Sequence, residues 1–246
     1  MRCLVAILLV AACGPPPAFA PKPLPELVAS AGPATPLTVA ALTLPPGESL
    51  IWNVHWKGIT IGRAELAVSA DGVRSRFKTD ALASTVISIQ YELETVLDRT
   101  AGHPTSATEN LTIGGETKQV VAMFDGASYA IDGRFFSLPD GNPGHTLHSA
   151  LGAVRAWAQP DARPGFLFIV HAGQLVRLEV ARPIVEELQG TKTLRVECRV
   201  HPQTDQREPF AATLWLTDDP KRTPVRIEVT SAGEHVTAEL FDTTAT

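Results

Sequence analysis

The residue with the most specific chemistry in this sequence is Cys13. It follows Val10-Ala11-Ala12 at the end of an apolar run that begins at Leu4, directly behind the basic part of the leader at Arg2. This layout is typical of a bacterial export signal, and its last four residues fit a lipobox, in which the cysteine thiol is acylated and the chain is cut before it. The sequence therefore predicts a signal peptide over residues 1–12 and a lipid anchor on Cys13, with acyl chains such as palmitate.

A second cleavage site competes with the first. Ala18-Phe19-Ala20 matches the A-x-A pattern of the ordinary signal peptidase, and cleavage after Ala20 would give a soluble periplasmic or secreted protein. We favour Cys13 because the apolar run ends there, and because Pro21, which has no N–H and a fixed φ, would directly follow the other cut. Gly14 stands where an Asp would signal retention at the inner membrane. By analogy with enteric bacteria, this predicts anchoring at the periplasmic face of the outer membrane.

The four tryptophans are the candidate ligand-binding residues. Trp52 and Trp56 alternate with polar residues on one predicted strand, so they share a face, which we expect to be the concave face of a curved sheet. Together with Trp157 and Trp215 they could line an apolar cleft for a lipid or another hydrophobic molecule. Packing in the core is the more ordinary role for such rings, and it is the alternative for all four.

Other reactive side chains fit structural roles better than chemical ones. Asp218-Asp219 precedes Pro220 and basic residues, which favours a turn that bonds its own backbone over an acid–base pair or a metal site. His145 and His148 have a spacing that could bind a metal, but no Glu or Cys near them completes a site. Cys198 alternates with valines and is expected to face the core. We therefore predict no catalytic residues, no metal and no cofactor.

Composition narrows the class of protein. The 246 residues are 44% hydrophobic and 19% charged, as in a globular domain, and the net charge is −5. Nucleic acid is not an expected partner, because no basic run is present to neutralise phosphates. No apolar run reaches the roughly 18–20 residues that span a bilayer. The cysteines give neither a disulfide framework nor zinc-finger spacing.

The elements behind the leader divide the chain into two parts. Residues 13–46 are rich in Pro and Ala and predict an extended tether behind the lipidated cysteine. Residues 47–246 predict a single mainly β domain, because a dozen or more stretches alternate with period two between glycine-containing turns. One short helix is predicted near 146–158, and residues 82–90 fit either a helix or a strand. So many strands must curl into a large antiparallel meander, half-barrel or barrel-like, to bury one face.

Three segments carry a resemblance to a known family. They are Gly47–Ile59 with Gly62 and Ala64, the helix region followed by the strands Phe166–Val180, and Leu214–Ile227 with its strand, polar turn, proline and strand. With these segments, residues 47–241 resemble the exported bacterial proteins of the domain-of-unknown-function 3108 family. The resemblance implies a strongly bent antiparallel meander on the periplasmic or outer surface. That family has no agreed activity, so the resemblance implies no catalytic residues.

Two classes of function follow from these features. The first is a non-enzymatic binding or carrier module for a lipid or other hydrophobic envelope component, held at the membrane by its lipid anchor. The second is a structural or protein-interaction module of the envelope, which would use exposed strand edges to bind a protein partner and would have no small-molecule ligand. A hydrolase of envelope polymers ranks third, because it would need carboxylates that only the fold could bring together.

Overall fold

A computed structural model describes residues 34–203 and 209–245, which form one large β-sheet with two α-helices and one 3₁₀ turn. The strands are β1 (Thr35–Pro36), β2 (Glu48–Trp56), β3 (Ile59–Val68), β4 (Gly72–Thr79), β5 (Ile89–Asp98), β6 (His103–Ile113), β7 (Glu116–Asp125), β8 (Ser128–Ile131), β9 (Arg134–Ser137), β10 (Gly144–His145), β11 (Gly165–His171), β12 (Gln174–Val180), β13 (Ile184–Leu188), β14 (Thr191–Pro202), β15 (Phe210–Thr217), β16 (Pro224–Ser231) and β17 (Glu234–Ala245). The helices are α1 (Ala81–Ser84) and α2 (Leu147–Trp157), and the 3₁₀ turn η2 is Pro139–Gly141.

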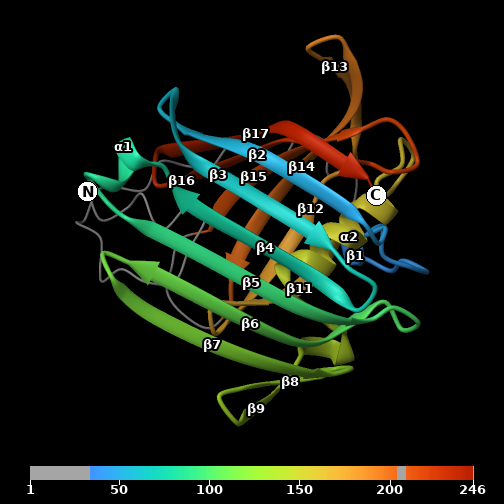
Figure 1. Cartoon of the computed structure of the whole chain (residues 1–246). Coiled ribbons are helices and arrows are strands. Elements are labelled where there is room, and N and C mark those ends of the chain that lie inside the picture. The colour runs from blue at the N-terminus through green and yellow to red at the C-terminus, as the bar shows by residue number, and fades with distance from the viewer. Residues whose placement is uncertain (1–33, 204–208, 246) are drawn as a thin grey trace.

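The strands lie side by side in nearly the order of the chain. Strands β11 to β17 follow one another, β17 pairs with β2, and β2 to β9 continue the same sheet (Figure 1). Neighbouring strands of this series are antiparallel, whereas β1 and β10 run parallel to β11 at the end of the sheet. The predicted mainly β, antiparallel and barrel-like meander is therefore confirmed.

Two-residue turns set the register of the hairpins. In each, an ordinary residue and a glycine both have positive φ, which is the backbone that a tight type I′ hairpin requires. Glycine adopts this conformation without strain, and the strong right-handed twist of such hairpins helps the sheet to curl. Turns of this kind occur at Lys57-Gly58, Asp132-Gly133, Ala172-Gly173, Gln189-Gly190 and Ala232-Gly233.

The two ends of the sheet overlap. Strand β11 is buried along its whole length, because other parts of the chain cover both of its faces. Leu167 and Ile169 pack in a core cluster with α2, β12 and β14. Phe166 and Phe168, on the opposite face, pack with Tyr129 of β8. The β7–β9 end of the sheet thus laps over β11, and in the described part of the chain side chains, not a strand ladder, hold the two ends together.

Helix α2 confirms the helix predicted near 146–158. Thr146 and Ser149 form a capping box at its start, each side chain bonding the backbone N–H of the other residue. The helix lies between the two halves of the sheet, with Val154 packed against β11–β15 and Leu151 packed against β2–β5. The buried surface of α2 fills the end of the barrel at which the helix lies, whereas the sequence had suggested an open concave face.

The last part of the predicted tether packs on the barrel. Strand β1 pairs with β11, and Leu44 is buried in a cluster with strands β2–β5. Leu44 lies so close to α2 that a Cβ at Gly152 would come within 2.8 Å of it. Thr43 N–H donates to the Gly152 carbonyl at 3.0 Å, and Arg99 donates to the Leu44 carbonyl at 2.9 Å. Residues 34–46 therefore belong to the folded unit, ahead of the boundary predicted at residue 47.

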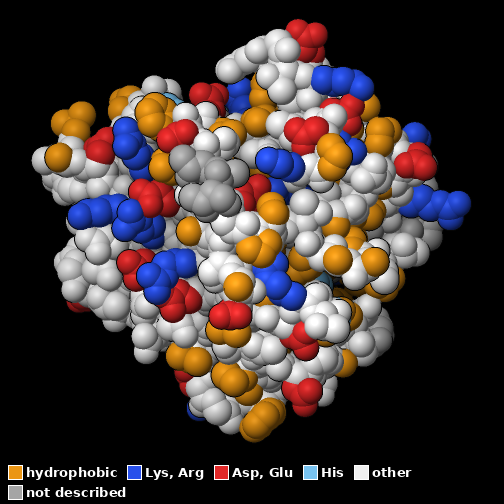
Figure 2. Space-filling model, turned by 45° about the vertical axis from the view of Figure 1, so that its right-hand side comes forward, with side chains coloured by type: hydrophobic (Ala, Val, Ile, Leu, Met, Phe, Trp, Pro, Cys, Tyr) orange, Lys and Arg blue, Asp and Glu red, His pale blue; other side chains and the backbone are white. Residues whose placement is uncertain are grey.

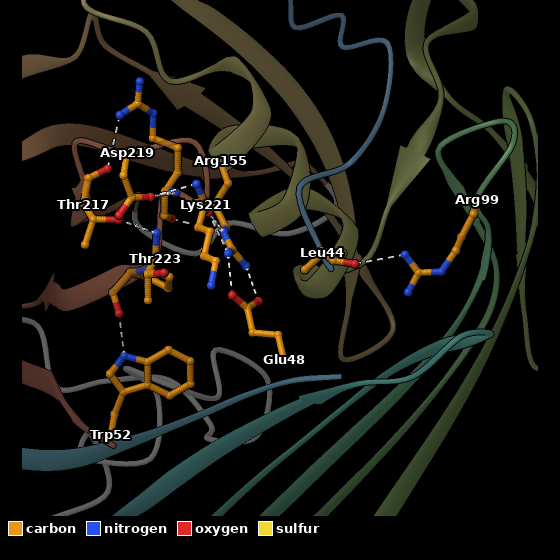
Figure 3. Close-up of polar contacts among 11 residues, drawn as sticks. Leu44, Glu48, Trp52, Arg99, Arg155, Thr217, Asp219, Lys221 and Thr223 are labelled. Atoms are coloured by element: carbon orange, nitrogen blue, oxygen red, sulfur yellow. Dashed lines mark hydrogen bonds and ion pairs between the residues drawn. The ribbon is translucent and has the colours of Figure 1, made fainter. Parts of the chain in front are cut away.

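A buried ion pair fixes α2 inside the barrel (Figure 3). Arg155 is fully buried and donates two parallel hydrogen bonds of 2.7 Å to the carboxylate of Glu48, at the start of β2. The same guanidinium donates to the carbonyls of Lys221 and Arg222 in the turn between β15 and β16. One side chain thus joins the helix to both halves of the sheet.

The remaining local predictions have clear outcomes. The ambiguous stretch over 82–90 contains both elements, since α1 ends at Ser84 and β5 begins at Ile89. Asp80 caps α1 by accepting from the Ala83 N–H at 2.8 Å.

Within residues 34–203 and 209–245, no helix is long and apolar enough to cross a membrane.

Replacing Arg155 with Leu should destabilise the fold by about 3–5 kcal/mol, because the Glu48 carboxylate would stay buried without a partner. Urea unfolding followed by tryptophan fluorescence measures the change. The matched control is Arg76→Leu, which removes the exposed pair between Arg76 and Glu65 and should cost about 0–1 kcal/mol. Equal losses in the two variants would show that the buried pair does not hold α2 in place.

Candidate functional site

The structure brings two of the four candidate tryptophans to the inner face of the sheet. Trp52 is buried beside Leu50 in a core cluster, and its indole N–H donates to the Pro224 carbonyl at 2.9 Å (Figure 3). Trp56 is half-buried and packs against the next cluster along β2. Its indole N–H donates to the Glu234 carboxylate at 2.8 Å. The predicted shared concave face of Trp52 and Trp56 agrees with this placement.

The other two tryptophans lie elsewhere. Trp157 ends α2, and its indole N–H donates to the Arg163 carbonyl at 3.2 Å. It lines a surface depression of about 510 Å³ between residues 38–41 and 156–163. Trp215 points to the outer face of β15, where its N–H donates to the Glu186 carboxylate and the Arg226 guanidinium lies 5.3 Å from its ring. The four rings therefore do not form one cleft.

An apolar surface inside the barrel is only partly covered. On β14, where α2 packs on the sheet, the inner-facing Leu194 and Val196 are fully buried. The strands that follow carry inner-facing apolar side chains in register across β15, β16, β17 and β2, and most of these stay half-buried, although Val54 and Val236 in the same rows are buried. We call this set the inner wall, and its members are Trp56, Phe210, Ala212, Leu214, Ile227, Val229 and Ala238.

Exposed apolar side chains lie near the β2–β3 turn and in the segment of α1, at the end of the barrel where Trp56 ends the inner wall. Ile59 pairs with Trp56 across the β2–β3 turn and is 60% exposed. The segment of α1 lies beside β3, because the Asp80 N–H donates to the Ile61 carbonyl at 2.9 Å. Leu82 and Val86 of this segment are also exposed. We call Ile59, Leu82 and Val86 the apolar rim, and such groups on a surface commonly mark binding sites.

A buried acid–base group lies on the inner face opposite the inner wall. Glu109 of β6 is within 3.0 Å of the His171 ring and accepts from the Ala172 N–H at 2.9 Å and from the Tyr91 hydroxyl at 3.4 Å. Burial opposes ionisation of Glu109, but the charge and hydrogen bond of His171, together with the hydrogen bonds from the Ala172 N–H and the Tyr91 hydroxyl, outweigh it and lower the pKa of the carboxyl. Burial raises the pKa of Tyr91 well above its usual value. The group joins β5 and β6 to the end of β11.

His145 and His148 bind hydroxyl groups in the core. His148 contacts Thr95 at 2.9 Å through Nδ1 and Ser75 at 2.8 Å through Nε2, and His145 contacts Ser149 at 3.3 Å. Burial lowers the pKa of His148 to about 3, and burial and the nearby His103 lower that of His145 to about 4. No group of three His, Cys, Asp or Glu side chains suited to a metal occurs among the described residues.

Two further expectations are confirmed. Asp219 bonds its own turn by accepting from the backbone N–H groups of Lys221 and Arg222 at 2.7 and 3.2 Å. Asp218 pairs with Lys192 and Arg222, whose hydrogen bonds lower its pKa. Cys198 faces the core, and burial raises the pKa of its thiol to about 12, which removes it as a nucleophile. Cys13 lies outside the described residues.

Sequence reasoning did not find the two buried carboxylates. Glu48 lies two residues before Leu50 on the inner face of β2, and Glu109 lies two residues before Leu111 on the inner face of β6. An acidic residue that alternates with the apolar residues of a strand could therefore have predicted both buried carboxylates. The partners Arg155 and His171 could not be assigned, because they lie 107 and 62 residues further along the chain.

Comparison with known proteins gives a fold but no family. No family model and no curated protein matches the chain. A solved β-barrel-like protein of the domain of unknown function DUF1849, from Brucella abortus, aligns over 85% of this chain and 99% of its own, with a TM-score of 0.58 and 10% identity. The two proteins share a fold. At this identity the similarity extends no further, and the resemblance to the 3108 family stays a prediction.

Weaker overlaps exist with two other solved proteins. A DUF1089 family protein from Pseudomonas aeruginosa overlaps with a TM-score of 0.42 and 12% identity, over 69% of this chain and 90% of its own. LprF from Mycobacterium bovis overlaps with a TM-score of 0.27 and 15% identity, over 83% of this chain and 88% of its own. The shared barrel-like architecture therefore rests on the Brucella protein.

The two core histidines should make the fold sensitive to mild acid. Their folded pKa values lie below the roughly 6.5 of an unfolded histidine, so from about pH 6.5 down to about 4 the unfolded chain binds protons that the folded chain does not. The free energy of unfolding should fall over this range by about 1.4 kcal/mol per pH unit for each histidine. His148→Gln should halve the slope, measured by urea unfolding between pH 7 and 5. His235→Gln, at an exposed histidine, is the control. A free energy of unfolding that does not change with pH in the unsubstituted protein would contradict the lowered pKa values of His145 and His148.

Proposed function

We propose that this chain is an exported lipoprotein of the bacterial cell envelope, and that its barrel is a non-enzymatic binding or carrier module for a lipid or other hydrophobic envelope component. In this proposal residues 1–12 are removed and Cys13 carries the acyl chains. The periplasmic face of the outer membrane is the proposed location, with Gly14 after the cysteine as its support. The predicted resemblance to exported proteins of the 3108 family belongs to the same proposal.

The inner wall is the observation that carries the binding role. A monomeric barrel with no ligand would gain about 25 cal/mol for each Å² of apolar surface that it covered with its own side chains. Here α2 covers only part of the inner face, and Trp56, Leu214 and Val229 on the inner wall stay half-buried. Apolar surface that faces inward and is bordered by an exposed apolar rim suits an acyl chain or a similar molecule.

The alternative is a structural or protein-interaction module with no small-molecule ligand. The observation that favours it is the filling of the barrel around α2, where Arg155, Val154 and Leu44 leave a packed core in place of a site. Cross-linking in membranes followed by purification distinguishes the two functions. A specific protein partner and no bound lipid would favour the interaction module.

Binding at the inner wall should be lost when the wall is charged. Purified protein should release a lipid on extraction and should take up a hydrophobic dye such as 1-anilinonaphthalene-8-sulfonate. Val229→Lys should lower dye uptake at least fivefold, because an ammonium group on the inner face opposes apolar contact. Thr230→Lys, on the outer face of the same strand, is the matched control. Dye uptake that is unchanged in Val229→Lys, with no lipid in the extract, would refute the binding role.

Lipidation at Cys13 is tested separately. Replacing Cys13 with Ser should move the protein from the membrane fraction to the soluble fraction of the cell envelope, because the acyl chains supply about 0.8 kcal/mol of membrane affinity per buried CH₂. Mass spectrometry of the N-terminal peptide reports the acyl groups directly. A chain that begins at Pro21, or membrane partitioning that Cys13→Ser leaves unchanged, would rule out this anchor.

A further inference from the structure

The outer face of strands β7–β9 carries large apolar side chains that nothing in the described structure covers. Met123, Ala130 and Phe135 lie in one row across the three strands. Phe135 is 85% exposed and Met123 is 55% exposed, and Val121 lies beside them on β7. We call Val121, Met123 and Phe135 the β7–β9 patch. Apolar side chains gather at the bottom of the molecule in Figure 2, where β8 and β9 lie.

The exposure of Phe135 is not a consequence of a loose hairpin. On the opposite face of the same hairpin, Phe136 stacks on Tyr129 with ring centroids 5.1 Å apart. Tyr129 is itself buried against Phe166 and Phe168 of β11. The hairpin is therefore held on the barrel through Tyr129 of β8, whereas β9 is exposed along its length, with Phe136 42% exposed and Phe135 on the other face 85% exposed. A surface built in this way is expected to have an occupant, because isolated domains seldom expose a large aromatic ring so fully.

The course of the chain indicates what that occupant is. The first described residue, Ala34, packs against the cluster that contains Tyr129 and Phe166, so the tether reaches the barrel beside β8. From Cys13 to Ala34 there are 34 − 13 = 21 residues. A chain of this length spans at most about 70 Å, which keeps the barrel close to the membrane that holds Cys13. The tether arrives on the side of the barrel that carries β8, so it can bring the β7–β9 patch to that membrane.

We propose that the β7–β9 patch contacts the surface of the lipid bilayer in which Cys13 is anchored. This inference rests on the membrane anchor of the proposed function. Aromatic and aliphatic side chains enter the boundary between headgroups and acyl chains readily. The contact would be weak alone, but the tether makes it intramolecular and therefore raises its effective concentration. It would hold the barrel in one orientation, with the β13–β14 hairpin on the far side from the membrane.

The test uses the mature chain, residues 13–246, coupled through Cys13 to a maleimide lipid in vesicles of phosphatidylethanolamine and phosphatidylglycerol at 3:1. Cys198 does not compete, because its thiol is buried. Hydrogen–deuterium exchange followed by mass spectrometry compares the coupled protein with the same chain free in solution. Amides of residues 121–137 should exchange at least threefold more slowly on the vesicle, and those of 184–191 in the β13–β14 hairpin should not change.

Matched variants connect the protection to the side chains. The double variant Met123→Ser and Phe135→Ser should lose the vesicle-dependent protection, and Val185→Ser, which removes an exposed apolar side chain on β13, should keep it. Equal exchange at 121–137 on and off the vesicle would overturn the inference. So would protection that appears without vesicles and rises with protein concentration, which would make a second copy of the chain the occupant.

The coupling chemistry separates this inference from the proposed function. The maleimide lipid replaces the natural acyl chains, so the contact is measured whether or not the cell modifies Cys13. Absence of acyl groups in the natural protein would refute the anchor and leave the measurement intact. Absence of protection in the coupled protein would refute the contact and leave the anchor intact.

Discussion

The fold depends on one buried charge pair. A guanidinium and a carboxylate removed from water cost several kcal/mol each, and their attraction offsets this only when the geometry is good and every remaining donor is used. Arg155 has this good geometry in its paired bonds to Glu48, and its Nε and Nη2 also donate to two carbonyls of the β15–β16 turn. The interaction therefore fixes the helix within the rolled sheet and, through Glu48, fixes the start of β2 beneath it.

The position of α2 determines what is left for binding. A sheet of this size cannot bury its inner face with its own strands alone, and here it uses two devices. At one edge β7–β9 laps over β11, and at one end of the barrel α2 lies between the two halves. Helix α2 reaches β15, but inner-facing apolar side chains of β15–β17 stay half-buried beyond it. The inner wall and the apolar rim are thus apolar surface that the fold covers only in part, which is why the proposed ligand site lies there.

A membrane tether gives both apolar surfaces a common setting. The inner wall would accept a hydrophobic molecule, and the β7–β9 patch would rest on the bilayer from which such a molecule comes. Phe136 of β9 stacks on the buried Tyr129 of β8, and strand alternation then turns Phe135 to the opposite, outer face. In this arrangement the acidic group of Glu109 and His171 has a structural role, because it joins the overlapping ends of the sheet.

The sequence by itself determined the fold class. A period of two along each strand, residue–glycine pairs at the turns and one stretch with helical spacing are enough to specify a curled antiparallel sheet with one short helix. These signals are local, since each depends on residues a few positions apart. The tertiary structure alone decided where α2 lies, that residues 34–46 belong to the barrel, and which tryptophans face inward. The alternation of Glu48 with Leu50 and of Glu109 with Leu111 was a local signal that two carboxylates face the core, one that sequence reasoning missed. Their partners lie 107 and 62 residues away, respectively, and a contact over such a distance is set by how the sheet rolls, which no local pattern encodes.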